Sequence, residues 1–93
     1  MQVLQSGTFK KALKKLHANQ KACLDEAVRI ILSDPLIGAQ KNGDLSLVRV
    51  HKFHMLDQLT LLAYKYDEQN SSIILLALGS NENFYRDLKT QVS

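Results

Sequence analysis

Six consecutive apolar residues, 73–78 (IILLAL), are the feature that most limits how this chain can fold. The polar residues 70–72 precede the run and Gly79 follows it, so the run is bounded by turn-forming residues on both sides. A run of this length, rich in β-branched residues at its start, favours a strand buried on both faces over a helix. Loops at the rim of a sheet often carry function, so the polar, aromatic and basic segment 80–89 becomes a candidate for it.

The length of 93 residues predicts a single domain spanning residues 1–93, and a hydrophobic share of 45% is that of a folded protein. The one cysteine, Cys23, excludes an internal disulfide framework and fits a reducing compartment, where it acts as a small buried hydrophobe. Neither a signal peptide nor a stretch as long as a membrane span is recognisable. We therefore expect a cytoplasmic protein.

A short strand at residues 3–4 is expected to precede the first helix, with a turn and an N-cap supplied by residues 6–8. Apolar residues then recur at helical spacing, and lysines fill the opposite face. The apolar set is Phe9, Ala12, Leu13 and Leu16, and the basic set is Lys10, Lys11, Lys14 and Lys15. This pattern predicts an amphipathic helix with a basic outer side, which is most often simply a solvated face.

A second helix is expected to begin at Asn19 as its N-cap and to end before Pro35, because the proline ring disfavours a helical residue before it. Its apolar positions, Leu24, Ala27, Val28 and Ile31, also follow helical spacing. The few residues between the two helices predict an antiparallel hairpin.

Residues 36–46 contain glycine, asparagine and aspartate and are predicted to form a loop. Three strands are expected after it, at 47–54, 59–66 and 73–78, and their short connections predict an antiparallel meander. The fold class is therefore α+β, with the helix hairpin packed on one face of an antiparallel sheet and the other face open. A short C-terminal helix over 83–89 is expected at the edge of the open face.

Twelve Lys and Arg residues against nine Asp and Glu give a net charge of +3, a weak bias towards polyanionic partners. The cysteine and the three histidines lack the spacing of zinc ligands, and the glycines do not form a phosphate-binding loop. We therefore expect no metal and no cofactor.

The strand at 47–54 concentrates basic and imidazole groups. Because side chains alternate across a strand, Lys52 and His54 share one face and His51 and Phe53 the other. If Phe53 packs under the helices, Lys52 and His54 point to the open side. An alternative is that this strand is only a basic, solvated face.

The segment after the third strand brings Asn81, Tyr85 and Arg86 towards the same region of the sheet. Cleavage of RNA without a metal needs a base for the 2′-hydroxyl, an acid for the leaving oxygen and cations for the phosphorane charge. Lys, His, Arg and Tyr side chains can fill these roles.

The order strand, helix hairpin, three-stranded meander and short C-terminal helix resembles the RelE/ParE superfamily of bacterial type II toxins. The segments KNGDLSLVRVHKFHM, QLTLLAYKYDE and IILLALGSNENFYRDLK are similar to those of RelE-like toxins. The resemblance implies a microbial-RNase-like fold, metal-independent cleavage of mRNA on the ribosome, and a cognate antitoxin as partner in a hetero-oligomer.

The resemblance also implies roles for single residues. Lys52 and His54 match basic positions that contact RNA or stabilise the transition state, and Tyr85 matches an aromatic residue that stacks on a base or orients the 2′-oxygen. Together with Asn81 they form the predicted catalytic set. The predicted RNA contacts are Arg49, Lys65, Arg86 and Lys89.

Two positions depart from the RelE pattern. Leu61 stands where RelE has an arginine, and Asn81 stands where nucleolytic members usually have His or Arg. An amide can neither donate a proton as a general acid nor hold a positive charge. Four alternatives therefore stay open: His54 carries the acid role, the nuclease activity is low, the chain is a ParE-like inhibitor of DNA gyrase, or it is an inactive antitoxin-binding homologue.

Overall fold

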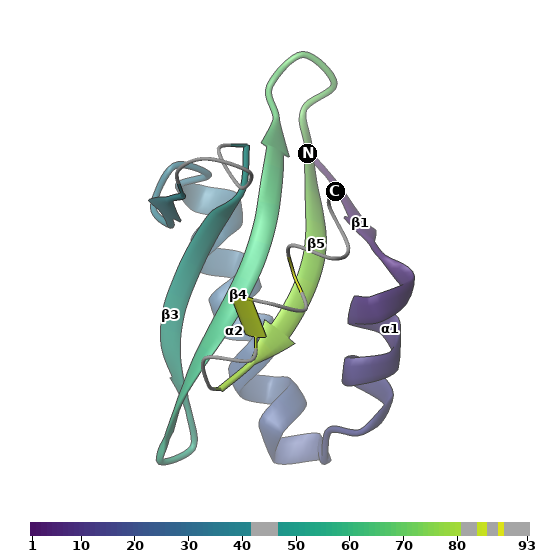
Figure 1. Cartoon of the computed structure of the whole chain (residues 1–93), viewed down its shortest axis with the longest axis vertical. Coiled ribbons are helices and arrows are strands. Elements are labelled where there is room, and N and C mark those ends of the chain that lie inside the picture. The colour runs from purple at the N-terminus through teal and green to yellow at the C-terminus, as the bar shows by residue number, and fades with distance from the viewer. Residues whose placement is uncertain (42–46, 81–83, 86–87, 89–93) are drawn as a thin grey trace.

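The computed structural model describes residues 1–41, 47–80, 84, 85 and 88. Within them, a five-stranded sheet has the order β1-β5-β4-β3-β2, and α2 crosses behind it (Figure 1). The expected α+β class is confirmed. The elements are β1 (Gln2–Gln5), α1 (Gly7–Lys14), α2 (Ala18–Ser33), β2 (Ala39–Gln40), β3 (Arg49–Met55), β4 (Gln58–Asp67) and β5 (Ser72–Gly79). In this part of the chain, none of the helices has the length and apolar character needed to cross a membrane.

Helix α1 begins where the sequence predicts. Ser6 is its N-cap, and the Ser6 hydroxyl accepts a hydrogen bond from the backbone N–H of Phe9 (3.1 Å). The same hydroxyl donates to the carbonyl of Leu76 (2.7 Å), so it ties the start of the helix to β5. Phe9 is the residue of α1 that is fully buried. One serine thus fixes both the beginning of the helix and its position on the sheet.

Helix α2 begins two residues earlier than predicted, and the assignment of Asn19 as its N-cap was wrong. His17 is the N-cap, and its backbone N–H donates to Oε1 of Gln20 (2.8 Å). Gln20 occupies the third helical position, where a glutamine reaches back to the cap. The end was predicted correctly, since Asp34 caps the helix immediately before Pro35.

The three-stranded antiparallel meander of β3, β4 and β5 is confirmed. Two features differ from the expected sheet. First, β1 pairs with β5 in parallel, so the sheet is mixed rather than purely antiparallel. Second, the predicted loop 36–46 contains β2, which pairs with Val50 and Arg49 of β3. Both pairings depend on tertiary contacts with distant or very short segments, which local periodicity does not reveal.

A β-bulge interrupts the pairing of β4 with β5, because Ala63 pairs with Ala77 while Tyr64 pairs with Leu75. Leu76 is the extra residue, and both Leu76 and Ala77 pack in the same apolar cluster. Side chains of a strand normally alternate between the two faces of the sheet. The extra residue shifts this alternation, so the bulge changes which residues of β5 point to each face. The prediction that the 73–78 run is a strand buried on both faces is confirmed.

Two apolar clusters lie on opposite faces of the sheet. The first joins the helices to the sheet through residues such as Phe9, Leu24 and Leu62. The second contains Phe84 and Leu88 packed on Val50, Leu61 and other strand residues. The expectation of an open second face was therefore wrong, because side chains of the C-terminal segment cover its centre.

The predicted C-terminal helix over 83–89 can be compared only at three positions. Phe84, Tyr85 and Leu88 have helical conformation, and the other residues of the range lie outside the described ones. Gly79 allows Phe84 to approach closely, since a Cβ at Gly79 would lie 2.7 Å from Cδ1 of the Phe84 ring. The glycine that ends β5 therefore makes room for the residue that covers the sheet.

Tyr64 joins the end of α2 to the sheet through its buried hydroxyl. That hydroxyl donates to the carbonyl of Pro35 (2.8 Å) and accepts from the backbone N–H of Gly38 (2.9 Å). Burial raises the pKa of Tyr64, so the phenol stays neutral and can make both bonds. The 35–38 segment is thus held by one side chain.

We expect Tyr64→Phe to lower the free energy of unfolding by about 1–3 kcal/mol, because it leaves one buried and one partly buried backbone group without this partner. Tyr66→Phe is the matched control, since Tyr66 lies two residues away on the same strand and is only half-buried. Urea unfolding of both variants measures the difference. Equal stability of the two variants would show that the Tyr64 hydroxyl contributes nothing.

Candidate functional site

Lys52 and His54 lie side by side on the sheet face that is turned away from the helices. Both are exposed, whereas Phe53 between them packs into the helix-side cluster. The expected alternation along this strand is confirmed. Their exposure leaves both side chains accessible to a ligand.

The neighbouring strands extend this region towards the end of β5. Lys52 pairs with Leu61, and Leu61 pairs in turn with Gly79. His54 pairs with Leu59, whose side chain is also exposed. We call Lys52, His54, Leu59 and Gly79 the strand-end surface. It places a cation and an imidazole beside the point where the chain leaves β5.

Leu61 lies between Lys52 and Gly79 of the strand-end surface but does not contribute a polar group. Its side chain is 8% exposed and belongs to the cluster that contains Phe84. The position where RelE has an arginine is therefore used here for packing. Leu61 therefore adds no charge to the strand-end surface.

Arg49 lies on the opposite face of the sheet from Lys52 and Lys65. Arg49 pairs with Tyr64, so its side chain starts on the helix-facing side of the sheet. Its Nη1 atom donates to the carbonyl oxygens of Leu36 (3.2 Å) and Gly38 (2.9 Å). Arg49 thus holds the chain before β2 and does not join Lys52. Strand alternation already separates Arg49 from Lys52, and applying it at the sequence level would have revealed this.

Lys65 lies on the same face as Lys52 but further along β4, where it pairs with Ile74. It stands four residues from Leu61 on the same strand, a separation of about 13 Å along an extended chain. Lys65 therefore lies beyond the strand-end surface. Asn81, Arg86 and Lys89 lie outside the described residues, so their predicted roles stay predictions.

Tyr85 is half-buried beside Phe84, with the two ring centroids 5.3 Å apart in an edge-to-face arrangement. The Nζ atom of Lys41 lies 5.1 Å from the centroid of the Tyr85 ring, a distance typical of a cation–π contact. Sequence reasoning did not single out Lys41, because it lies in a loop with no periodic pattern. The structure therefore adds a cation beside the predicted aromatic residue.

His51 lies on the helix side of β3 and is not part of the strand-end surface. Its ring stacks on Phe53, with centroids 6.0 Å apart and planes inclined by 9°. Its Nε2 atom is buried and has no hydrogen-bond partner among the described residues. Burial therefore lowers the pKa of His51 below the ordinary value for histidine.

This histidine predicts a pH dependence of stability. The unfolded chain protonates His51 at a pKa near 6.5, whereas the folded chain resists protonation, so the unfolded state binds more protons below that pH. We expect the free energy of unfolding to fall as the pH drops from about 7.5 to 5.5. Urea unfolding across this range tests it, and His51→Phe should flatten the dependence. A wild-type protein whose stability does not change between these values would contradict the prediction.

No group of three or more His, Cys, Asp or Glu side chains that could hold a metal ion occurs among the residues whose positions are described. The strand-end surface instead offers an ammonium group and an imidazole. These can stabilise a phosphate charge and transfer a proton, respectively.

Comparison with solved structures identifies the fold class as that of the RelE toxins. The intact Escherichia coli RelBE toxin-antitoxin complex contains a chain with 17% identity and a TM-score of 0.71, and the match covers 87% of this chain and 96% of that one. A double-arginine mutant of E. coli RelE in the free state gives 15% identity and a TM-score of 0.75, with coverage of 98% and 92%. At such identities the likeness shows the fold alone.

A conserved hypothetical protein of Helicobacter pylori is also similar, with 20% identity, a TM-score of 0.51 and coverage of 87% of this chain and 94% of that one. Comparison of the sequence with curated proteins gives no match. The model of a protein family described as ParE-like toxin of type II bacterial toxin-antitoxin system matches residues 3–89. The chain belongs to this family, which confirms the resemblance to the RelE/ParE superfamily.

Proposed function

We propose that this toxin is a metal-independent endoribonuclease that cleaves mRNA on the ribosome and so inhibits translation. The observation that carries the proposal is the position of Lys52 and His54 on β3. Both side chains are exposed on the same face of the sheet, near the end of β5. The RelE fold supports the same proposal. A ribosomal target would place the toxin in the cytoplasm.

The proposed reaction is attack of the 2′-oxygen of a ribose on the adjacent phosphorus atom. A base removes the proton of the 2′-hydroxyl, the new P–O bond forms, and the bond to the 5′-oxygen breaks as an acid protonates that oxygen. The products are a 2′,3′-cyclic phosphate and a 5′-hydroxyl. His54 supplies one of the proton transfers, and Lys52 stabilises the negative charge of the phosphorane.

The other predicted site residues complete this proposal. Tyr85, with Lys41 over its ring, would stack on a base or orient the 2′-oxygen, and Arg86 would add positive charge. Asn81 would orient the substrate by hydrogen bonds, because an amide cannot serve as a general acid. Lys65 and Lys89 would contact the RNA backbone outside the reacting phosphate.

A second candidate function is inhibition of DNA gyrase without catalysis, as in ParE toxins. Two observations favour it: Leu61 is buried and apolar where RelE has an arginine, and the matching family is described as ParE-like. Induced expression separates the two candidates when primer extension on cellular mRNA is combined with a gyrase supercoiling assay. Cleaved mRNA with normal supercoiling supports the endoribonuclease, and the reverse result supports the gyrase inhibitor.

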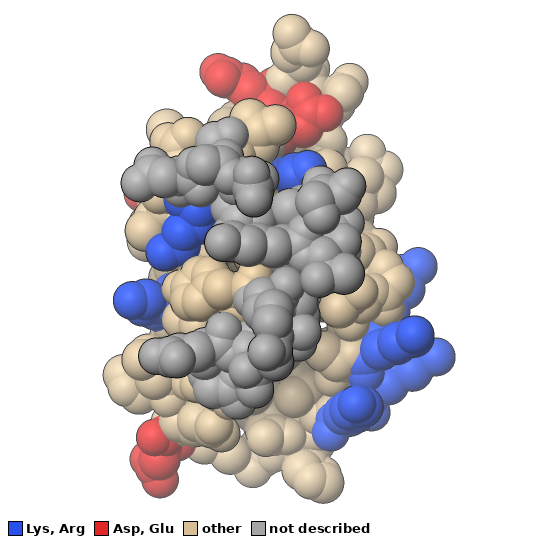
Figure 2. All heavy atoms as spheres, viewed as in Figure 1, with Lys and Arg blue, Asp and Glu red and all other residues tan. Residues whose placement is uncertain are grey.

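We also propose that a cognate antitoxin binds this chain in a hetero-oligomer, as the antitoxin RelB binds RelE in the solved complexes. The net charge of +3 and the exposed Lys and Arg side chains offer complementary charge to an acidic partner (Figure 2). The same feature supports the inactive antitoxin-binding alternative, in which binding persists without any enzymatic activity.

This charge predicts that salt slows association with the antitoxin more than it speeds dissociation. Raising the ionic strength from about 0.05 to 0.5 M should lower the association rate constant about tenfold, because screening removes electrostatic steering. Surface plasmon resonance on the purified pair measures both rate constants. An association rate independent of ionic strength would contradict the electrostatic part of the proposal.

A further inference from the structure

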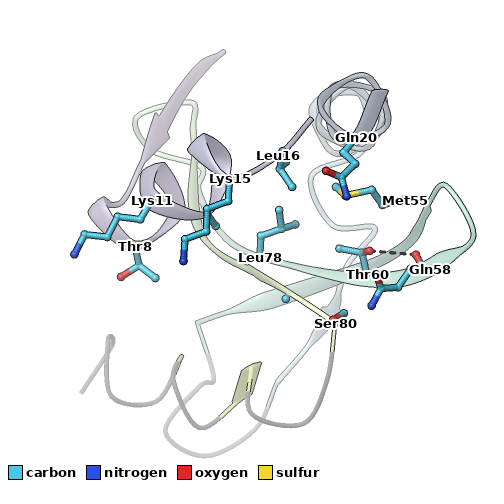
Figure 3. Close-up of a pocket in the computed structure, with 12 residues that line it drawn as sticks. Thr8, Lys11, Lys15, Leu16, Gln20, Met55, Gln58, Thr60, Leu78 and Ser80 are labelled. Carbon is cyan, nitrogen blue, oxygen red and sulfur yellow. Dashed lines mark hydrogen bonds between the residues drawn. The ribbon is translucent and has the colours of Figure 1, made fainter. Parts of the chain in front are cut away.

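A cleft of about 580 Å³ lies on the helix side of the sheet and meets the strand-end surface only at Gly79 (Figure 3). Helix α1 and the residues just after it form one wall, and the start of α2, the β3–β4 hairpin and the end of β5 form the other. This volume lies within the range of about 300–1,000 Å³ that is usual for small-molecule sites. Lys52 and His54, the groups of the proposed cleavage reaction, do not line this cleft.

The floor of the cleft is apolar. Leu16, Met55 and Leu78 come from three different elements of the fold and line it together. Met55 is buried, whereas Leu16 and Leu78 remain half-buried, so part of their surface is available to a ligand. A flat apolar or aromatic group would find a matching surface here.

Two cations stand on one side of this floor. Lys11 lies in α1 and Lys15 is the C-cap of this helix, about one turn further on, and their side chains extend over the same end of the cleft (Figure 3). Helix α1 contains no acidic residue. Among the described residues the only ion pair joins Arg29 to Glu26, so neither lysine is neutralised there by a carboxylate.

Polar groups on the opposite wall come from Gln20, Gln58 and Thr60. The Oε1 atom of Gln20 accepts from the N–H of His17, which leaves its amide nitrogen to donate. The hydroxyl of Thr60 donates to the carbonyl of Gln58 (3.2 Å), which leaves its oxygen to accept. This wall therefore presents both a donor and an acceptor beside the apolar floor.

We propose that this cleft binds a nucleoside monophosphate, either free or as one unit of an RNA strand. The phosphate carries a charge of about −1.5 to −2 near neutral pH, which two lysines can balance. The base lies on the floor made by Leu16, Met55 and Leu78, and its polar edge faces Gln20 and Thr60. Binding here does not depend on cleavage activity, so it can be tested separately from the proposed function.

The test is titration of the full-length protein, labelled with ¹⁵N, with AMP, UMP, adenosine, inorganic phosphate and a short acidic peptide, followed by NMR. We expect saturable shifts of the amide resonances of Thr8, Leu16 and Ser80 with both nucleotides, and affinities at least about tenfold weaker for adenosine and phosphate alone. A 5′-phosphorylated trinucleotide RNA distinguishes the sources: tighter binding than AMP indicates an RNA strand, and equal binding indicates a free nucleotide.

The double variant Lys11→Ala/Lys15→Ala should weaken AMP binding about tenfold or more. The matched control is Lys10→Ala/Lys14→Ala, which removes the same charge from the same helix but from residues that do not line this cleft. We expect the control to bind AMP within about twofold of the wild type. Equal losses in both double variants, shifts equally strong with phosphate alone, or a response only to the acidic peptide would each overturn the proposal.

Discussion

Replacement of His54 by alanine is expected to lower ribosome-dependent mRNA cleavage by about 10²–10⁴-fold, the usual effect of removing a general acid or base. His54 is exposed at the end of β3 and shares its face with Lys52. Single-turnover cleavage of mRNA on purified ribosomes measures the effect.

Lys52→Ala should also lower cleavage, because it removes a cation from the surface that stabilises the phosphorane. Lys21→Ala is the matched control, since Lys21 is exposed on α2 and its loss changes the net charge equally. The melting temperatures of all three variants should remain close to that of the wild type, because these side chains are exposed. Cleavage that is reduced equally by Lys21→Ala would indicate an effect of net charge alone.

Phe84→Ala is expected to lower the free energy of unfolding by about 3–5 kcal/mol, the range measured for removal of a large aromatic side chain from a core. Phe84 is 5% exposed, and its ring lies against Gly79 and within the cluster on the second face of the sheet. Its loss would leave apolar side chains such as Leu61 and Ala63 without their cover. Urea unfolding measures the change.

Tyr85 provides the matched control for this experiment. It follows Phe84 directly but is only half-buried, so Tyr85→Ala should cost much less stability than Phe84→Ala. The same variant should reduce activity if Tyr85 stacks on a base, an interaction of about 1–3 kcal/mol. Equal stability losses in the two variants would show that the two side chains do not differ in role as we propose.

Local patterns in the sequence predicted most of the elements. The apolar spacing in α1 and α2, the Pro35 stop and the buried run in β5 each depend on residues close together in the chain. The alternation at Lys52, Phe53 and His54 was equally local, and the structure confirms it. Such features follow from helical and strand periodicity alone.

The features that the sequence did not predict depend on contacts between distant segments. The parallel pairing of β1 with β5 joins residues about seventy positions apart, such as Gln2 and Ser72. To predict that the second face is covered, one would have to know that Phe84 packs against Gly79. The cap of α2 was misplaced for a different reason, because Gln20 supplies the capping group and Asn19 does not.

The candidate site was predictable only in part. Strand alternation placed Lys52 and His54 together, but it could not bring Lys41 to the ring of Tyr85, since that contact crosses between two segments of irregular sequence. Arg49 was included for its charge, whereas its backbone partners Leu36 and Gly38 became visible only in the structure. Charge alone therefore does not distinguish a residue that binds RNA from one that holds a loop.

If Lys52 and His54 cleave RNA, as we claim, the ends of the cleavage products identify the reaction. Purified wild-type toxin and the Lys52→Ala/His54→Ala variant are incubated with ribosomes programmed with a defined mRNA, and the cleavage products are mapped and their ends identified. We predict 2′,3′-cyclic phosphate and 5′-hydroxyl ends with the wild type, and almost none with the variant. Intact mRNA with the wild type, in a preparation that inhibits gyrase supercoiling, would contradict the claim.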